Sequence, residues 1–211
     1  MLYLQKEKCS KLSNYSYIIG LRKLIHKIIM AQVMKDVMID IESLSVAPNA
    51  TILTIGAIKF NRKGSLKSME EYDSFYIRID PQSCEDIGCH TDPDTVEWWQ
   101  NQPSEAIYEA LENPDRVSIK SALTKLSEWF GDVEYVWANS PSFDCVILES
   151  AYSLCNMEMP WKFWVNRDCR TLFDIANICK SDMPRNEKHH ALYDCYRQIV
   201  GVKKALKKLK K

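Results

Sequence analysis

Beyond residue 35, the first part of the chain carries apolar runs that predict three β-strands. The run VMIDI within 36–42 is short and almost wholly apolar, which is typical of a buried strand. A longer apolar run follows at 50–60 after the turn-forming segment SVAPN, and residues 71–79 alternate as a half-covered antiparallel strand does. The polar link at 61–68 has the composition of a hairpin connection. These three strands therefore predict a meander.

The remainder of the chain alternates between helical and strand patterns. The first helix is expected after Asp92-Pro93, with Asp94 as its N-cap and Glu97 in the capping-box position. Further helices are predicted at 104–112, 118–130, 141–155, 170–180 and 189–209, and short strands at 134–139 and 162–168. The order β-β-β-α-β-α-β-α predicts an α/β domain with a mixed sheet, helices on its faces and active groups at the ends of its central strands.

The formal net charge of zero is the sum of three segments that differ strongly. Residues 1–35 carry seven Lys or Arg residues and one acid, Glu7, and the last eleven residues carry six lysines and no acid. Residues 36–200 hold 15 basic and 27 acidic residues, a net of −12. Because an acidic body repels polyanions at long range, the C-terminal lysines are the obvious local attraction for a polyanionic ligand.

A basic amphipathic helix is predicted within the first 33 residues. Apolar residues recur at helical spacing from Ile18 to Val33, and the interspersed cations argue against a signal peptide or a transmembrane segment. The pattern leaves open whether this helix lies on a membrane, contacts nucleic acid, covers an apolar patch of its own domain or has little functional weight. Since Met34 directly precedes a strand that can open a complete domain, we divide the chain into an extension at 1–33 and a domain at 34–211 with a lysine-rich C-terminal helix end.

The eight cysteines do not form a recognisable disulfide or zinc framework. They include no CxxC pair, and a chain of this size does not need disulfides to fold, so we expect reduced thiols in a cytoplasm. Cys84, Cys89 and His90 lie close together, but no second pair of ligands is near them in the sequence. Small buried side chains are therefore the favoured interpretation.

Two acids interrupt the first predicted strand. Burying an unpaired carboxylate is costly, so Asp40 and Glu42 in an apolar strand require an explanation. Their spacing of two places both side chains on one face, where they repel each other unless a proton or a cation intervenes. Hard oxygen ligands in this arrangement suit Mg²⁺ or Mn²⁺. The alternative that a DxE pattern alone leaves open is an exposed strand end with two solvated acids.

Other titratable residues follow in an order that favours a single site. Asp144 comes after the predicted strand at 134–139 and begins a helix, where its charge also suits the helix dipole. Asp194 lies near the start of the last helix, after His189 and His190, and a histidine near a carboxylate cluster is a candidate general base. Each residue alone has an ordinary structural role open to it, but their order and placement together point to catalysis.

These residues carry a resemblance to a known group of enzymes. Asp40-Ile41-Glu42, Phe143-Asp144, and His189 with Asp194 resemble the three motifs of the DEDDh 3′-5′ exonucleases, which have the ribonuclease H-like fold. The segments DIESLSVAPNATILTIGAIKF, DPDTVEWWQ, NSPSFDCVIL and RDCRTLFDIA are similar to the actinobacterial 3′-5′ exoribonuclease family that also includes phage-encoded exonuclease A. The resemblance covers residues 36–200 and implies a ribonuclease H-like mixed sheet flanked by helices.

The resemblance also implies a mechanism. A metal-dependent 3′-5′ exonuclease would remove nucleoside 5′-monophosphates from single-stranded RNA or DNA ends or from 3′ overhangs. Two Mg²⁺ or Mn²⁺ ions, about 4 Å apart, would be held by Asp40, Glu42, Asp144 and Asp194. His189 would take the proton from the attacking water. His190 competes for this role because it lies one helical turn before Asp194, whereas the family spacing favours His189.

Contacts to the substrate are expected from apolar side chains near the acids. Aromatic residues hold single strands by stacking on bases, and Phe143 is the first candidate by resemblance. Trp98 or Trp99 would line the groove, although adjacent helix residues cannot both face inward. Leu44 would wedge against the last base, and Ser43 keeps a hydroxyl where relatives often carry Thr.

Several points stay open in the sequence. Asp168 recurs in the family pattern and is assigned, together with Arg170, to structural support of the site rather than to metal ligation. A homodimer would match many relatives, and the sugar of the substrate is not indicated, because no side chain announces a contact to a 2′-hydroxyl. The competing functions are a non-catalytic nucleic-acid-binding module on a nuclease fold and a hydrolase of short oligonucleotides.

Overall fold

The computed structural model describes residues 34–185 and 189–210. The predicted basic helix within 1–33 lies outside the described residues, so the division of the chain at residue 33 stays a prediction. Among the helices that are described, none is long and apolar enough to cross a membrane.

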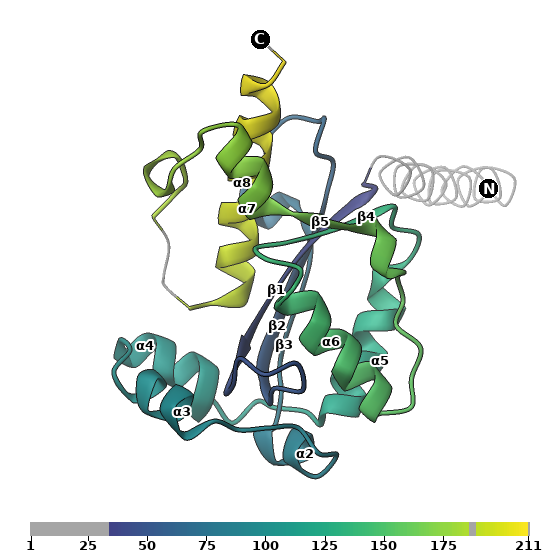
Figure 1. The fold of residues 1–211 in the computed structure, drawn as a ribbon, viewed down its shortest axis with the longest axis vertical. Coiled ribbons are helices and arrows are strands. Elements are labelled where there is room, and N and C mark those ends of the chain that lie inside the picture. Colours follow the sequence, from purple (N-terminus) through teal and green to yellow (C-terminus); the bar gives the residue numbers. More distant parts are fainter. Residues whose placement is uncertain (1–33, 186–188, 211) are drawn as a thin grey trace, which may run out of the picture. The chain divides into compact units, whose positions relative to one another are not determined.

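A five-stranded mixed sheet organises the described residues in the order β3-β2-β1-β4-β5 (Figure 1). The strands are β1 (Asp36–Ser43), β2 (Ile52–Phe60), β3 (Asp73–Arg78), β4 (Tyr135–Ala138) and β5 (Asn166–Asp168). Strands β1, β2 and β3 pair antiparallel, which confirms the predicted meander. Strands β4 and β5 join the other edge of β1 in parallel. Strand β1 is therefore central.

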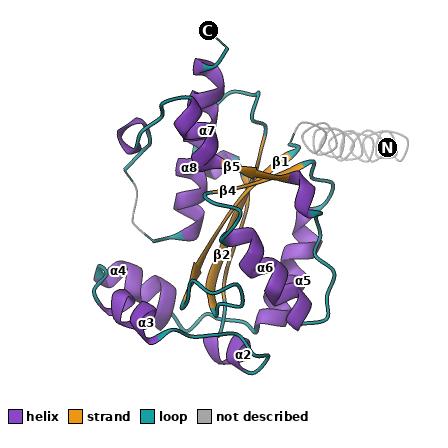
Figure 2. Cartoon of the chain, in the orientation of Figure 1, coloured by secondary structure: helices purple, strands orange, loops and turns teal. Residues whose placement is uncertain are grey.

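Helices cover both faces of the sheet (Figure 2). On one face lie α5 (Ile119–Phe130) and α6 (Asp144–Leu154), and on the other lie α7 (Cys169–Ile175) and α8 (Ala191–Lys208).

Strand β1 explains this layering through its alternation. Val37, Ile39 and Ile41 are buried against the α5 and α6 side, while Met38 is buried against α7 and α8. The even-numbered positions that follow Met38 are Asp40 and Glu42. The side chains of the two acids therefore lie on the face of the sheet that α8 covers.

The shorter helices gather around the ends of the strands. They are α2 (Pro81–Glu85), α3 (Pro93–Gln100), α4 (Ser104–Ile107), the π-helix η2 (Tyr108–Glu112) and the 3₁₀ helices η1 (Met69–Glu71), η3 (Phe163–Val165) and η4 (Lys180–Asp182). Helices α3, α4 and η2 bury Trp99, Ala106 and Ala110 in a small apolar cluster with Leu44 and Leu53.

The start of α3 differs from the sequence prediction. Asp92, rather than Asp94, is the N-cap, because its Oδ1 accepts the Asp94 N–H at 3.0 Å and Pro93 fills the first helical position. This shift removes Glu97 from the capping-box position.

Two other boundaries were wrong, and one helix kept its predicted bounds but changed its type. The strand predicted at 162–168 is confined to β5, because residues 163–165 form the helix η3, in which Phe163 and Trp164 are 70% and 64% exposed rather than buried in a sheet. The helix predicted at 104–112 changes to a π-helix at Tyr108. The helix predicted at 170–180 ends at Ile175, shortly before Asn177 turns to a φ of +49°.

Gly56 allows α8 to lie directly on the sheet. In β2 it pairs with Asp40 of β1 on one side and with Tyr76 of β3 on the other. A Cβ atom at this position would lie 2.5 Å from Ala191 C and Leu192 N, which is closer than real Cβ contacts come. The missing side chain therefore lets the first turn of α8 approach the strand that carries Asp40.

The lysines at the end of α8 are engaged with neighbouring loops. Lys203 donates to the carbonyls of Asn61 and Gly64, Lys204 donates to the carbonyl of Asp182, and Lys208 donates to the carbonyl of Asn177 at 3.0 Å. A role for these lysines in attracting a polyanion stays a prediction.

We expect Gly56→Ala to destabilise the protein by about 1–3 kcal/mol, because the new methyl group forces the backbone of α8 away from β2. The melting temperature should fall by roughly 2–10 °C in differential scanning calorimetry. Gly64→Ala is the matched control, since its nearest neighbours are Asn61 side-chain atoms at 3.4 Å or more. Equal melting temperatures for Gly56→Ala and wild type would contradict this account of the contact.

Candidate active site

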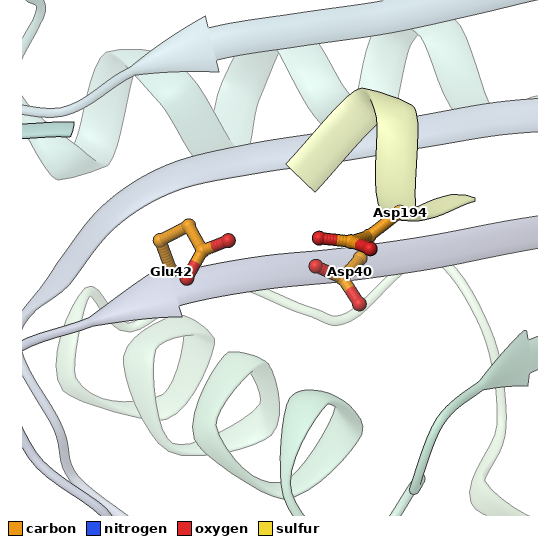
Figure 3. Close-up of side chains that lie close together, drawn as sticks. All are labelled: Asp40, Glu42 and Asp194. Atoms are coloured by element: carbon orange, nitrogen blue, oxygen red, sulfur yellow. The ribbon is translucent and has the colours of Figure 1, made fainter. Parts of the chain in front are cut away.

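Three of the predicted acids meet at the middle of the sheet. One carboxylate oxygen from each of Asp40, Glu42 and Asp194 lies within 4.8 Å of the other two. Figure 3 shows Asp40 and Glu42 projecting from β1 toward Asp194, which descends from α8. No other cluster of this kind occurs among residues 34–185 and 189–210.

The first turn of α8 brings Asp194 into this cluster. The Asp194 N–H donates to the His190 carbonyl at 3.0 Å, so the carboxylate belongs to the turn that rests on Gly56. Arg197, one turn further along, places Nη1 3.9 Å from Asp194 Oδ1. Helix packing on a glycine thus joins residues that are about 150 positions apart in the sequence.

Asp144 reaches the same strand from the opposite side. Strand β4 ends at Ala138 and pairs only with the first residues of β1, so the later peptide groups of β1 have no strand partner on that edge. The Ile41 N–H instead donates a hydrogen bond to Asp144 Oδ1 at 3.2 Å. Asp144 opens α6 and is only 3% exposed. The shortness of β4 therefore makes room for the fourth acid.

Crowding raises the pKa values of the two acids on β1. Burial raises the pKa of Asp40 well above its usual range, and the charges of Asp144, Glu42 and Asp194 raise it further. Burial, with the charges of Asp194 and Asp144, raises the pKa of Glu42 to about 8. With a pKa of about 8, the Glu42 carboxyl group is mostly protonated at neutral pH when no cation is bound.

The two acids on helices are also shifted, but they have counteracting partners. Burial raises the pKa of Asp144 to about 7, against the lowering effects of the Ile41 N–H and the Arg170 charge. Burial raises the pKa of Asp194, while Arg197 and the His189 N–H lower it.

The donor set fits a hard divalent cation. The cluster contains only carboxylate oxygens, which Mg²⁺ and Mn²⁺ prefer. Gln198 donates to Asp40 Oδ1 at 2.7 Å, and its own buried Oε1 has no hydrogen-bond partner among the described residues. An oxygen that lacks a donor beside crowded carboxylates is compatible with a hydrated cation at this place.

The two histidines occupy different surroundings. His189 has a φ of +60°, and its ring centroid lies 4.8 Å from that of Trp98 and 5.9 Å from that of Trp99. The His190 ring stacks on Tyr76 at 4.6 Å and tilts against Tyr193 at 4.5 Å.

A cavity of about 890 Å³ opens beside both histidines. It is lined by α4, η2 and the start of α8, including Tyr108, Glu109 and Tyr193.

The residues predicted to touch a substrate are unequally accessible. Trp98 is 45% exposed, whereas Trp99 is 1% exposed and its indole N–H donates to the Ser43 carbonyl at 3.0 Å. Ser43 and Leu44 are 8% and 6% exposed. Phe143 is partly buried at the start of α6. A base stacks only on an accessible ring, so Trp98 is the tryptophan with a free face for this role.

Asp168 and Arg170 lie outside the acid cluster. Asp168 caps α7 by accepting the N–H groups of Arg170 and Thr171, while the Arg170 charge lowers the pKa of Asp144. Arg170 therefore acts on the site through its charge, and Asp168 stabilises the start of the helix that carries Arg170.

Among residues 34–185 and 189–210, no cysteine belongs to a cluster that could hold a metal ion. His90 Nδ1 lies 2.9 Å from Ser45 Oγ, and Cys84 Sγ donates to the Ile52 carbonyl. All seven cysteines of the described residues are free.

Sequence reasoning missed Gln198, Tyr76 and Glu109. Gln198 follows Asp194 by four residues, so helical spacing alone places it on the same face and was a usable signal. No local pattern marks Tyr76 or Glu109, because their contact with each other depends on tertiary structure.

Comparisons with known proteins agree with this geometry. The phage T4 exodeoxyribonuclease is 24% identical to this chain over 208 residues, which covers 82% of this chain and 90% of the phage protein. Among solved structures, a zinc-bound complex of E. coli ExoI with single-stranded DNA superposes with a TM-score of 0.54 at 12% identity, over 78% of this chain and 38% of that one. Cell-death related nuclease 4 superposes with a TM-score of 0.52 at 11% identity, over 82% and 63%.

At these identities the structural likeness establishes the fold, which confirms the expected ribonuclease H-like architecture. The chain spans less than two thirds of either solved protein. Residues 35–206 match the family described as the 3′-5′ exoribonuclease Rv2179c-like domain, which confirms the resemblance to the DEDDh exonucleases. The chain belongs to this family of 3′-5′ exonucleases.

Proposed function

We propose that this exonuclease removes nucleoside 5′-monophosphates from the 3′ ends of single-stranded nucleic acids or overhangs, with two Mg²⁺ or Mn²⁺ ions in its active site. The observation that carries the proposal is the convergence of Asp40, Glu42 and Asp194 within 4.8 Å, with Asp144 hydrogen-bonded to the same strand. These four carboxylates would hold the ions. Ions bound there would activate the attacking water and stabilise the charge on the leaving 3′ oxygen.

His189 is our choice for the base that accepts the proton of the attacking water. Its ring lies beside the exposed Trp98, where a substrate end has access. The His190 ring is instead packed between Tyr76 and Tyr193, with Nε2 3.9 Å from Glu109 Oε1. A base must reach the water that it deprotonates, and packing between two tyrosines works against this for His190.

Trp98 and Phe143 would hold the terminal bases by stacking, which tolerates any base sequence. The E. coli ExoI structure was solved with single-stranded DNA, and the phage T4 relative is an exodeoxyribonuclease, whereas the matched family is described as exoribonucleases. We therefore propose a single-stranded substrate and leave its sugar to a direct comparison of matched RNA and DNA strands.

Buried free thiols support a reducing compartment such as the cytoplasm. A homodimer stays a prediction.

Purified protein with Mn²⁺ should release mononucleotides stepwise from a 5′-labelled single strand, giving a ladder of shortened labelled products. Asp40→Asn should lower the rate by at least about 10³-fold, because it removes a charged ligand while preserving shape. Gel electrophoresis of matched RNA and DNA strands measures both rates.

Glu128→Gln, a similar change at an exposed position on α5, should retain wild-type activity. A wild-type protein that binds the strand without cutting it would favour the binding-module alternative. Cleavage confined to dinucleotides would favour the short-oligonucleotide hydrolase, and full activity in Asp40→Asn would contradict the site.

The raised pKa values predict that metal-free protein loses stability as pH rises. A carboxyl group whose folded pKa is raised stabilises the fold fully below its unfolded pKa, and this stability is lost as pH rises toward the folded value. Glu42, raised from 4.5 to about 8, places the loss between about pH 4.5 and 8. In scanning calorimetry without metal, the melting temperature should therefore fall between pH 5.5 and 8, and Mn²⁺ should raise it more at pH 8.

Glu42→Gln is the control, because it lacks the titrating group and should show a smaller decline. A gain from Mn²⁺ that is independent of pH would show that the crowded acids do not titrate in this range.

A further inference from the structure

Glu109 forms a partly buried network on the side of the sheet next to the acids. Its Oε1 accepts the Tyr76 hydroxyl at 2.6 Å and Arg78 Nε at 2.7 Å, and Arg78 Nη2 lies 2.6 Å away. The side chains of Glu109 and Arg78 are 17% and 20% exposed. Removing one member of a charged pair that is shielded from water to this extent is costly, because the other charge then lacks its partner.

The network joins three segments that are distant in the sequence. Glu109 lies in the π-helix η2, and Tyr76 and Arg78 lie on β3. His190, immediately before α8, stacks on the Tyr76 ring and places Nε2 3.9 Å from Glu109 Oε1. A π-helix inserts an extra residue into a turn and is common at functional sites, and here it includes Glu109.

The contacts that hold the His190 ring also restrict the backbone of its neighbour, His189. The His189 backbone has a φ of +60°, a conformation that L residues other than glycine rarely adopt. Such a conformation persists where the surrounding structure holds it in place. On the C-terminal side, the His190 ring is fixed by Tyr76, Tyr193 and Glu109, and the next residue, Ala191, rests on Gly56.

We propose that Glu109 is a positioning residue, which through His190 holds His189 at the angle needed to reach the attacking water. This inference rests on the proposed function. Glu109 does not belong to the acid cluster, and its Oε1 accepts hydrogen bonds from Tyr76 and Arg78.

A double-mutant cycle between Glu109 and His189 tests this directly. Glu109→Ala should lower kcat by about 10- to 100-fold in the wild-type background, the loss expected for a catalytic group displaced by about 1 Å. In the His189→Ala background the same substitution should lower kcat by less than about threefold, because the group it positions is already gone. KM for the single strand should change by less than about threefold in either background.

Two conservative variants separate positioning from general support of the fold. Glu109→Gln keeps an oxygen that accepts from Tyr76 and Arg78, so its kcat should lie between those of wild type and Glu109→Ala. Tyr76→Phe keeps the ring stacked on His190 and removes only the hydroxyl, so we expect a smaller loss in kcat than for Glu109→Ala. This loss should likewise be reduced in the His189→Ala background. If Glu109→Ala does not fold, the cycle is run with Tyr76→Phe.

The metal-induced rise in melting temperature checks that the acids are intact in each variant, and Glu128→Gln serves again as the unaffected control. Equal losses in both backgrounds, a raised KM with unchanged kcat, or full activity in His189→Ala would each overturn the positioning role. A wild-type protein without nuclease activity would instead contradict the proposed function, so the two failures are distinguishable.

Discussion

The active site of this domain depends on carboxyl groups that the fold holds close together at the central strand of the sheet, although they repel one another. Asp40, Glu42 and Asp194 present oxygens within 4.8 Å, and the buried Asp144 of α6 accepts a hydrogen bond from the Ile41 N–H of β1. Ionised groups this close in a low-dielectric interior are stable only with protons or cations between them. Burial raises the pKa values of all four acids, and the charges of the neighbouring acids raise those of Asp40 and Glu42 further. A fold that keeps them together is therefore prepared for a divalent cation at a cost in its own stability.

Backbone features, rather than strong side-chain contacts, maintain this crowding. The early end of β4 leaves the Ile41 N–H available for Asp144, and Gly56 lets the first turn of α8 lie against β2 so that Asp194 faces Asp40. The same turn follows His189 and His190, whose rings contact Trp98 and Tyr76. The same turn of α8 therefore positions Asp194 and the two histidines, so a substitution that moves this turn would displace all of them.

The order of the strands along the chain and the choice of the four acids could be predicted from the sequence, because the alternation in β1 and the motifs are properties of short segments. Boundaries were less predictable: Asp92 replaced Asp94 as the cap, and Phe163 and Trp164 proved to be exposed on a 3₁₀ helix. The burial of Trp99 beside the exposed Trp98 depended on which face of α3 meets Leu44 and Leu53. The contact between Tyr76 and Glu109 joins β3 to a π-helix, and no sequence pattern in either segment predicts it.

Calorimetric titration of the metal-free protein with Mn²⁺ at pH 7, in two buffers of different ionisation enthalpy, tests the central claim most directly. Because Glu42 has a pKa of about 8, cation binding must displace its proton, and we predict release of about one proton or more for each protein molecule. The release should fall in Glu42→Gln. Mn²⁺ binding without proton release, or no Mn²⁺ binding by the folded protein, would contradict the account.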